Sequence, residues 1–145
     1  MGRTGLKNLG NTCYMNSMLQ CLANSEPLVR FYLLDSYLTQ INKESTYGSK
    51  GVLSRAFSEL LQQLYLGSKP SVSPWGVKNA IGNIDIRFKG FVQNDSQELL
   101  GCLLDTLHED VNQVTKKPLV ELKDSDGRAD QEVADEYWQG HLQRE

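Results

Sequence analysis

Apolar residues that recur at the spacing of an α-helix constrain this chain more than any other feature of its sequence. The clearest run lies on one helical face and consists of Leu53, Ala56, Phe57, Leu60, Leu61 and Leu64. Gly67 and Pro70 end this helix, because neither residue continues a helix well. Similar patterns predict further helices over about 13–22, 25–34, 73–81, 94–112 and 131–143, and all but the last have a capping residue or a proline at the start. The chain is therefore expected to be mainly α-helical.

Two segments break this pattern. Residues 82–91 alternate apolar and polar side chains as a strand does, but their glycines and Asp85 weaken a strand, so we expect an extended loop. Residues 113–130 are charged and rich in turn-forming residues, which indicates a flexible link. A chain of 145 residues is long enough for one domain with its own core. We therefore expect a single domain over residues 1–145, with a flexible link near 113–130.

Composition and charge exclude several classes of function. The net charge of −3 argues against non-specific binding of nucleic acid and against binding to an anionic membrane surface. No apolar run approaches the length of a membrane span, and no signal-peptide pattern opens the sequence. We therefore expect no nucleic-acid partner and no membrane partner.

The three cysteines indicate a reducing compartment. Cys13, Cys21 and Cys102 are odd in number and are not spaced as a disulfide framework or a zinc site. This usage is typical of cytoplasmic or nuclear proteins, and we expect neither a metal nor a cofactor. Cys21 and Cys102 lie within predicted helices, where small packed side chains are the usual interpretation.

Cys13 lies where a loop becomes a helix, directly after the capping residues Asn11 and Thr12. A lone cysteine in an apolar helix is most often a small buried hydrophobic residue. The alternative is a nucleophile, because the positive end of a helix favours the thiolate. That effect is worth only about 0.3–1 kcal/mol, so a catalytic Cys13 would also need a histidine nearby. Asn8 carries an amide that is able to donate to a developing oxyanion.

Asp95 and Glu98 have the spacing of a capping box at the start of the helix over 94–112. In this interpretation Asp95 accepts from the first free backbone N–H groups and Glu98 reaches back to the backbone. The pattern by itself favours this structural role.

Two stretches resemble motifs of one protein family. GLKNLGNTCYMNSMLQ, sixteen positions from Gly5, resembles the cysteine box of the ubiquitin-specific proteases, which are deubiquitinating enzymes. QNDSQELL, from Gln93, resembles the acidic box of the same family. The resemblance implies the helical thumb lobe of a papain-like cysteine protease, a fold that is α+β when complete with its palm and fingers. It aligns Cys13 with the family's nucleophile and Asn8 with its oxyanion-hole residue.

The acidic box gives the resemblance a second implication. In the family this box lies beside the cleft that takes the C-terminal tail of ubiquitin, which contains arginines and ends in Gly-Gly. Carboxylates and amides are suitable partners for such a tail. Asp95 is therefore expected to bind the tail, with Gln97 and Glu98 behind it.

The histidines limit what the resemblance implies. His108 is flanked by acids on a predicted helix face, and His141 lies in a run that precedes the palm in the family, so both are poor candidates for the catalytic base. The family's histidine box and the CxxC pairs of its fingers have no match in the sequence. We therefore expect the palm and fingers to be absent from this chain. A second polypeptide or a missing C-terminal half would then carry the histidine and its Asp or Asn partner.

The function that follows is thiol-dependent hydrolysis of the isopeptide or peptide bond after the C-terminal glycine of ubiquitin. The expected partners are ubiquitin and ubiquitinated proteins. This chain would supply the nucleophile and would be inactive without the missing half. The alternative is a non-catalytic helical module that binds ubiquitin or an adaptor. A helical scaffold without a ubiquitin role is a third interpretation, which the sixteen-position match disfavours.

Overall fold

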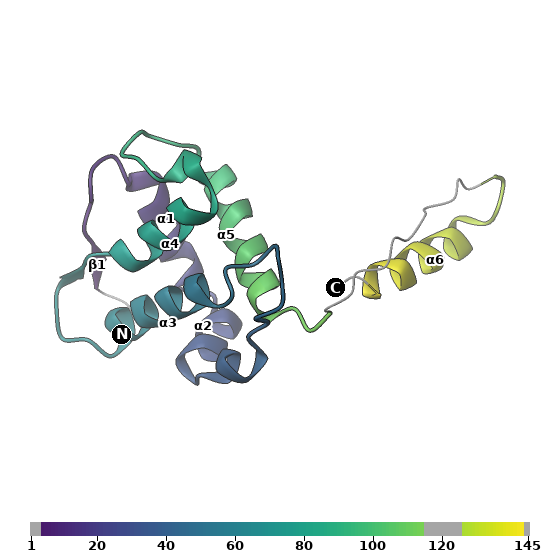
Figure 1. Ribbon diagram of the computed structural model, residues 1–145, viewed down its shortest axis with the longest axis horizontal. Helices are drawn as coiled ribbons and strands as arrows, with labels where there is room; N and C mark the ends of the chain where they lie inside the picture. Colours follow the sequence, from purple (N-terminus) through teal and green to yellow (C-terminus); the bar gives the residue numbers. More distant parts are fainter. Residues whose placement is uncertain (1–3, 115–125, 144–145) are drawn as a thin grey trace. The chain divides into compact units, whose positions relative to one another are not determined.

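The computed structural model describes residues 4–114 and 126–143, and Figure 1 shows the course of the chain. Within these residues the helices are α1 (Cys13–Leu22), α2 (Glu26–Leu33), α3 (Val52–Tyr65), α4 (Trp75–Ile84), α5 (Ser96–Val111) and α6 (Asp130–Leu142). Two 3-10 helices, η1 (Ser36–Gln40) and η2 (Ile86–Phe88), and two strands, β1 (Gly5–Leu6) and β2 (Ser71–Val72), complete the described elements. The chain separates into two compact units, residues 1–111 and 112–145.

The mainly α-helical fold predicted from the apolar spacing is confirmed. Helix α3 covers the predicted face and buries Leu53, Phe57 and Leu61 completely. Helix α4 ends at Ile84, three residues later than the pattern predicted. Residues 86–88 then form η2 within the segment that was expected to be an extended loop. The correction is local, because a single 3-10 turn follows where the apolar alternation resembled a strand.

One short sheet joins the start of the chain to its middle. Strands β1 and β2 run parallel, with Gly5 opposite Ser71 and Leu6 opposite Val72. The backbone N–H of Lys7 donates to the carbonyl oxygen of Val72 at 2.8 Å. The sheet therefore fixes the backbone immediately before Asn8.

The core of the first unit is apolar and continuous. Helix α3 packs against α2, α4 and α5, and α1 packs against α5 (Figure 1). The aromatic rings of Tyr32 and Phe57 meet edge to face, with centroids 5.1 Å apart. The buried side chain of Asp110 accepts hydrogen bonds from the backbone N–H and hydroxyl groups of Ser49 and Ser54. This carboxylate ties the end of α5 to the start of α3.

The second unit contains α6, which confirms the helix predicted over 131–143. Arg128 pairs with Glu136 across its first turns. Trp138 and Leu142 are exposed within this unit. The link predicted near 113–130 lies mostly outside the described residues. Among the helices that the structure describes, none is both long and apolar enough to cross a membrane.

Candidate functional site

Cys13 is the first residue of α1, and its side chain is exposed. The two residues at the turn before it have positive φ angles, 112° at Gly10 and 51° at Asn11. Gly10 is required there for a second reason, because a Cβ atom at this position would lie 3.2 Å from a ring carbon of Phe91. The thiol is thus presented at the helix N-terminus, where the backbone N–H groups favour an anion.

The side chain of Asn8 holds this turn together. Its Oδ1 atom accepts from the backbone N–H groups of Gly10 at 3.0 Å and Thr12 at 3.1 Å, and from the Thr12 hydroxyl at 3.1 Å. Because backbone N–H groups only donate, the atom that faces them must be the amide oxygen. The NH₂ group of Asn8 has no partner among the residues that the structure describes, so it is left as a donor beside the start of α1.

Thr12 does not cap α1 as its position suggested. Its side chain makes no hydrogen bond to the first turn of the helix. The buried hydroxyl instead accepts from the backbone N–H of Leu9 at 2.9 Å and donates to Asn8. The side chain of Thr12 therefore satisfies none of the first-turn N–H groups near Cys13.

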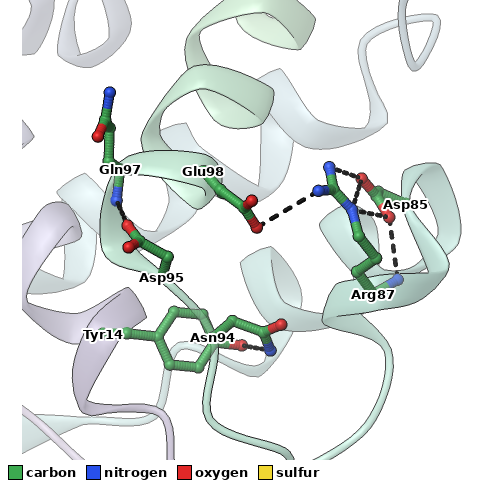
Figure 2. Close-up of polar contacts among 7 residues, drawn as sticks. All are labelled: Tyr14, Asp85, Arg87, Asn94, Asp95, Gln97 and Glu98. Carbon is green, nitrogen blue, oxygen red and sulfur yellow. Dashed lines mark hydrogen bonds and ion pairs between the residues drawn. The ribbon is translucent and has the colours of Figure 1, made fainter.

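The cysteine loop lies against the segment that leads to the acidic box. The side-chain amide of Asn11 donates to the carbonyl oxygen of Phe91 at 3.0 Å. Figure 2 shows a second contact, in which the side-chain amide of Asn94 lies 3.4 Å from the hydroxyl of Tyr14. Tyr14 follows Cys13 and Asn94 precedes Asp95, so the two predicted motifs are neighbours in the folded unit.

Asp95 caps α5. Its Oδ1 atom accepts from the backbone N–H of Gln97 at 2.6 Å, and its backbone carbonyl accepts from Leu99 at 3.2 Å. The other carboxylate oxygen has no partner among the described residues, and the side chain lies on an exposed part of the surface. Capping therefore leaves one oxygen of Asp95 available.

Glu98 does not complete a capping box. Its carboxylate lies 3.3 Å from Nη1 of Arg87 and does not reach back to the backbone of α5 (Figure 2). Arg87 also forms a close pair with Asp85, whose Oδ2 atom accepts from Nε at 2.9 Å and from Nη2 at 2.6 Å. These hydrogen bonds from Arg87 lower the pKa of the Asp85 carboxyl below its usual value. Sequence reasoning missed this pair, because nothing in the local pattern indicates that residue 87 meets α5.

Neither histidine takes part in the contact between the motifs that Tyr14 and Asn94 form. His108 is exposed on α5, twelve residues after Ser96, which is about 18 Å along the helix axis from its first residue. His141 lies on α6 in the second unit, where its ring is 5.2 Å from that of Trp138. Among the described residues, no group of three or more His, Cys, Asp or Glu side chains is arranged to hold a metal ion.

The exposure of Cys21 corrects one further expectation. It lies on α1 with an exposed side chain, so it is not the packed small residue that the helical pattern suggested. Cys102 on α5 is half-buried, and burial raises the pKa of its thiol. The exposed Cys21 thus offers an internal comparison for the reactivity of Cys13.

Comparison with known proteins gives relatives of high similarity. Ubiquitin carboxyl-terminal hydrolase 32 from Homo sapiens is 49% identical over 143 residues, which cover 99% of this chain and 9% of the relative. Ubiquitin carboxyl-terminal hydrolase 15 from Homo sapiens is 46% identical over 143 residues, again 99% of this chain but 15% of the relative. This chain therefore spans a small part of the length of these relatives.

A solved structure shares the fold. The SAGA Ubp8/Sgf11/Sus1/Sgf73 DUB module bound to ubiquitin aldehyde matches with a TM-score of 0.60 and 20% identity, over 83% of this chain and 28% of the matched chain. This likeness confirms the helical N-terminal lobe that the sequence predicted. The model of the family described as ubiquitin carboxyl-terminal hydrolase matches residues 4–144. The two motifs, the fold and the relatives agree, and the chain belongs to the ubiquitin carboxyl-terminal hydrolase family, as a part of a ubiquitin-specific protease.

Proposed function

We propose that this chain supplies the nucleophilic half of a deubiquitinase, which hydrolyses the isopeptide or peptide bond after the C-terminal glycine of ubiquitin. One observation carries the proposal. An exposed Cys13 begins α1, and the preceding turn binds the amide oxygen of Asn8 so that its NH₂ group remains a donor. This is the pairing of a thiol and an oxyanion donor that acyl transfer to sulfur requires.

The reaction would proceed in two steps. In the first, the thiolate of Cys13 attacks the carbonyl carbon of the terminal glycine, and the carbonyl oxygen becomes an oxyanion. Asn8 and the backbone N–H groups at the start of α1 donate to that oxyanion. The C–N bond then breaks, the amine leaves with a proton from a histidine, and a thioester remains on Cys13. In the second step water attacks the carbonyl carbon of the thioester while the same histidine takes a proton from the water. The C–S bond then breaks, ubiquitin leaves with a free C-terminal carboxyl group, and the thiolate of Cys13 is restored.

Asp95 is proposed to select the substrate. The carboxylate oxygen of Asp95 that does not cap α5 is able to accept a charge-assisted hydrogen bond from an arginine of the ubiquitin tail. Glu98 already pairs with Arg87, so its carboxylate would be shared between Arg87 and the tail. Gln97 would be a supporting contact beside Asp95. The matched structure is described as bound to ubiquitin aldehyde, which supports ubiquitin as the ligand.

The catalytic base is proposed to come from outside this chain. His108 lies well along α5 from the contact between Tyr14 and Asn94. We therefore propose that a second part, with a histidine and its Asp or Asn partner, completes the site. Alone, this chain would carry a thiol of ordinary reactivity and would not turn over substrate.

Ubiquitin with a C-terminal electrophile tests the proposal. The 145-residue chain is treated alone and together with the histidine-bearing half. We expect a covalent adduct at Cys13 in the completed protein, no adduct in Cys13→Ala, and an undiminished adduct in Cys21→Ser. The exposed Cys21 on the same helix makes the last variant a matched control. Reversible binding without an adduct would indicate a ubiquitin-binding module instead, and neither binding nor adduct would contradict both functions.

A further inference from the structure

Lys78 is a charged residue buried in the first unit. It lies on α4 and is 2% exposed. Its Nζ atom donates to the carbonyl oxygens of Phe88 and Gly90, the latter at 2.6 Å, and lies 5.8 Å from the centre of the Phe91 ring. Within the part of the chain that the structure describes, the partners of this ammonium are therefore carbonyl groups and a ring, not a carboxylate.

This arrangement is not explained by packing alone. A buried lysine is costly for a fold, and burial lowers the pKa of Lys78 accordingly. An apolar residue of similar length would fill the same space at less cost. The carbonyls of Phe88 and Gly90, however, belong to a turn that lies outside the sheet, and the ammonium binds both of them. The visible effect of Lys78 is to fix this turn.

The turn leads directly to the cysteine loop. A ring carbon of Phe91 lies 3.2 Å from the position that a Cβ atom on Gly10 would take. The Phe91 ring also meets the ring of Trp75 edge to face, with centroids 6.2 Å apart. The carbonyl oxygen of Phe91 accepts from the side-chain amide of Asn11 at 3.0 Å. A continuous series of contacts thus joins Lys78 to the loop that carries Asn8 and Cys13.

We propose that Lys78 is a positioning residue for the reaction at Cys13. It fixes the turn over residues 88–91, and Phe91 then holds Gly10 and Asn11 in the conformation that presents Cys13 and the Asn8 amide. This inference rests on the proposed function for its catalytic meaning. The structural coupling between Lys78 and Asn11 does not depend on the proposed function, because it is a property of the fold and is measurable without catalysis.

A double-mutant cycle tests the coupling through catalysis. Lys78→Met removes the donors while keeping the length of the side chain, and Asn11→Gly removes the side-chain amide while keeping the positive φ angle accessible. In the completed protein we expect each variant to slow adduct formation with the ubiquitin electrophile about tenfold. The double variant should be no slower than the slower single variant, because both changes break the same series of contacts.

Val77→Ala is the matched control. Val77 is buried next to Lys78 on α4, so this change lowers stability but removes no hydrogen bond to the turn. Its effect on the rate of adduct formation should be independent of that of Asn11→Gly, so the double variant should be slowed by the product of the two single effects. If the double variant with Lys78→Met and Asn11→Gly slows adduct formation by the product of the two single effects, the two residues act independently. Lys78 would then be an ordinary core residue. If Lys78→Met does not fold, Lys78→Gln keeps a neutral donor and is measured in the same cycle.

A second readout separates this inference from the proposed function. In the 145-residue chain without its second half, Lys78→Met should shift the side-chain amide signals of Asn11 in the NMR spectrum and speed their exchange with solvent, whereas Val77→Ala should leave them unchanged. Unchanged Asn11 signals in folded Lys78→Met would overturn the inference whatever the catalytic outcome. A parent protein that forms no adduct would overturn the proposed function and leave this NMR comparison valid.

Discussion

Asn11 donates a hydrogen bond from its side-chain amide to the carbonyl oxygen of Phe91, 80 residues further along the chain, at 3.0 Å. Asn11 belongs to the cysteine motif, and Phe91 lies just before the acidic motif. A second hydrogen bond, between Asn94 and Tyr14, runs in parallel with it. The two motifs are separate in the sequence but form one surface because these side chains tie their loops together.

Asn8 is expected to act through its NH₂ group and to hold the loop through its oxygen. Asn8→Asp keeps an acceptor for the N–H groups of Gly10 and Thr12 but loses the donor, whereas Asn8→Ala loses both. Both variants should slow turnover of a ubiquitin C-terminal substrate by about 10²- to 10³-fold, the usual effect of removing one oxyanion donor. Steady-state kinetics of the completed protein measures this effect.

Thermal unfolding supplies the control for these two variants. Asn8→Ala should unfold at a lower temperature than Asn8→Asp, because it leaves the buried hydroxyl of Thr12 and the two backbone donors without their acceptor. An Asn8→Asp protein with the parent's turnover rate would show that the amide group does not donate in the reaction.

Asp95 combines two roles that a pair of variants separates. Asn caps helices about as well as Asp, so Asp95→Asn should keep the cap on Gln97 and lose only the charge. Asp95→Ala should lose both, and its free energy of unfolding should fall by about 1 kcal/mol. We expect both variants to bind ubiquitin roughly tenfold more weakly, because a charge-assisted contact is lost. Titration calorimetry and denaturant unfolding give the two quantities.

Alkylation of Cys13 by iodoacetamide controls for damage to the site. Neither variant at Asp95 should change its rate, since the small reagent does not use the tail cleft. Equal ubiquitin affinity in Asp95→Asn and the parent would leave Asp95 with its capping role alone.

Local patterns predicted the helices well, and contacts between distant segments escaped prediction. Helix α3 follows its apolar spacing because five of the six residues on that face enter one core. Pairing of β1 with β2 involves two residues from each strand, too few for a periodic signal. Thr12 looked like a cap in sequence but bonds to Asn8, because the turn through Gly10 brings those side chains together.

The candidate site divides in the same way. The two sequence motifs identified Cys13, Asn8 and Asp95 as candidates, and the structure brings their segments together. Their catalytic and binding roles stay predictions. Nothing in the sequence indicated a role for Lys78, because a single lysine in a helical segment is normally exposed to solvent. Its burial depends on the return of residues 88–91 over α4, which no local pattern indicates. The cytoplasmic or nuclear location is likewise still a prediction.

Asp110 should be essential for stability and unimportant for the site. It is fully buried and accepts four hydrogen bonds from Ser49 and Ser54. Asp110→Ala leaves those donors without their acceptor, so the free energy of unfolding should fall by about 3–5 kcal/mol. Asp105→Asn, at an exposed position on the same helix, should change it by less than about 0.5 kcal/mol. Urea unfolding measures both, and an Asp110→Ala protein as stable as the parent would contradict this account of the α3–α5 junction.

Tyr32 should make stability fall at high pH. Burial raises the pKa of its phenol from 10.0 to about 12, so the folded protein holds a proton that the unfolded chain releases. The stabilising contribution is therefore complete below pH 10 and is lost as the pH rises toward 12. Relative to Tyr32→Phe, the parent should lose about 2 kcal/mol of unfolding free energy between about pH 9 and pH 11.5. Parallel stability curves for the parent and Tyr32→Phe over this range would mean that the Tyr32 phenol ionises as easily in the folded protein as in the unfolded chain.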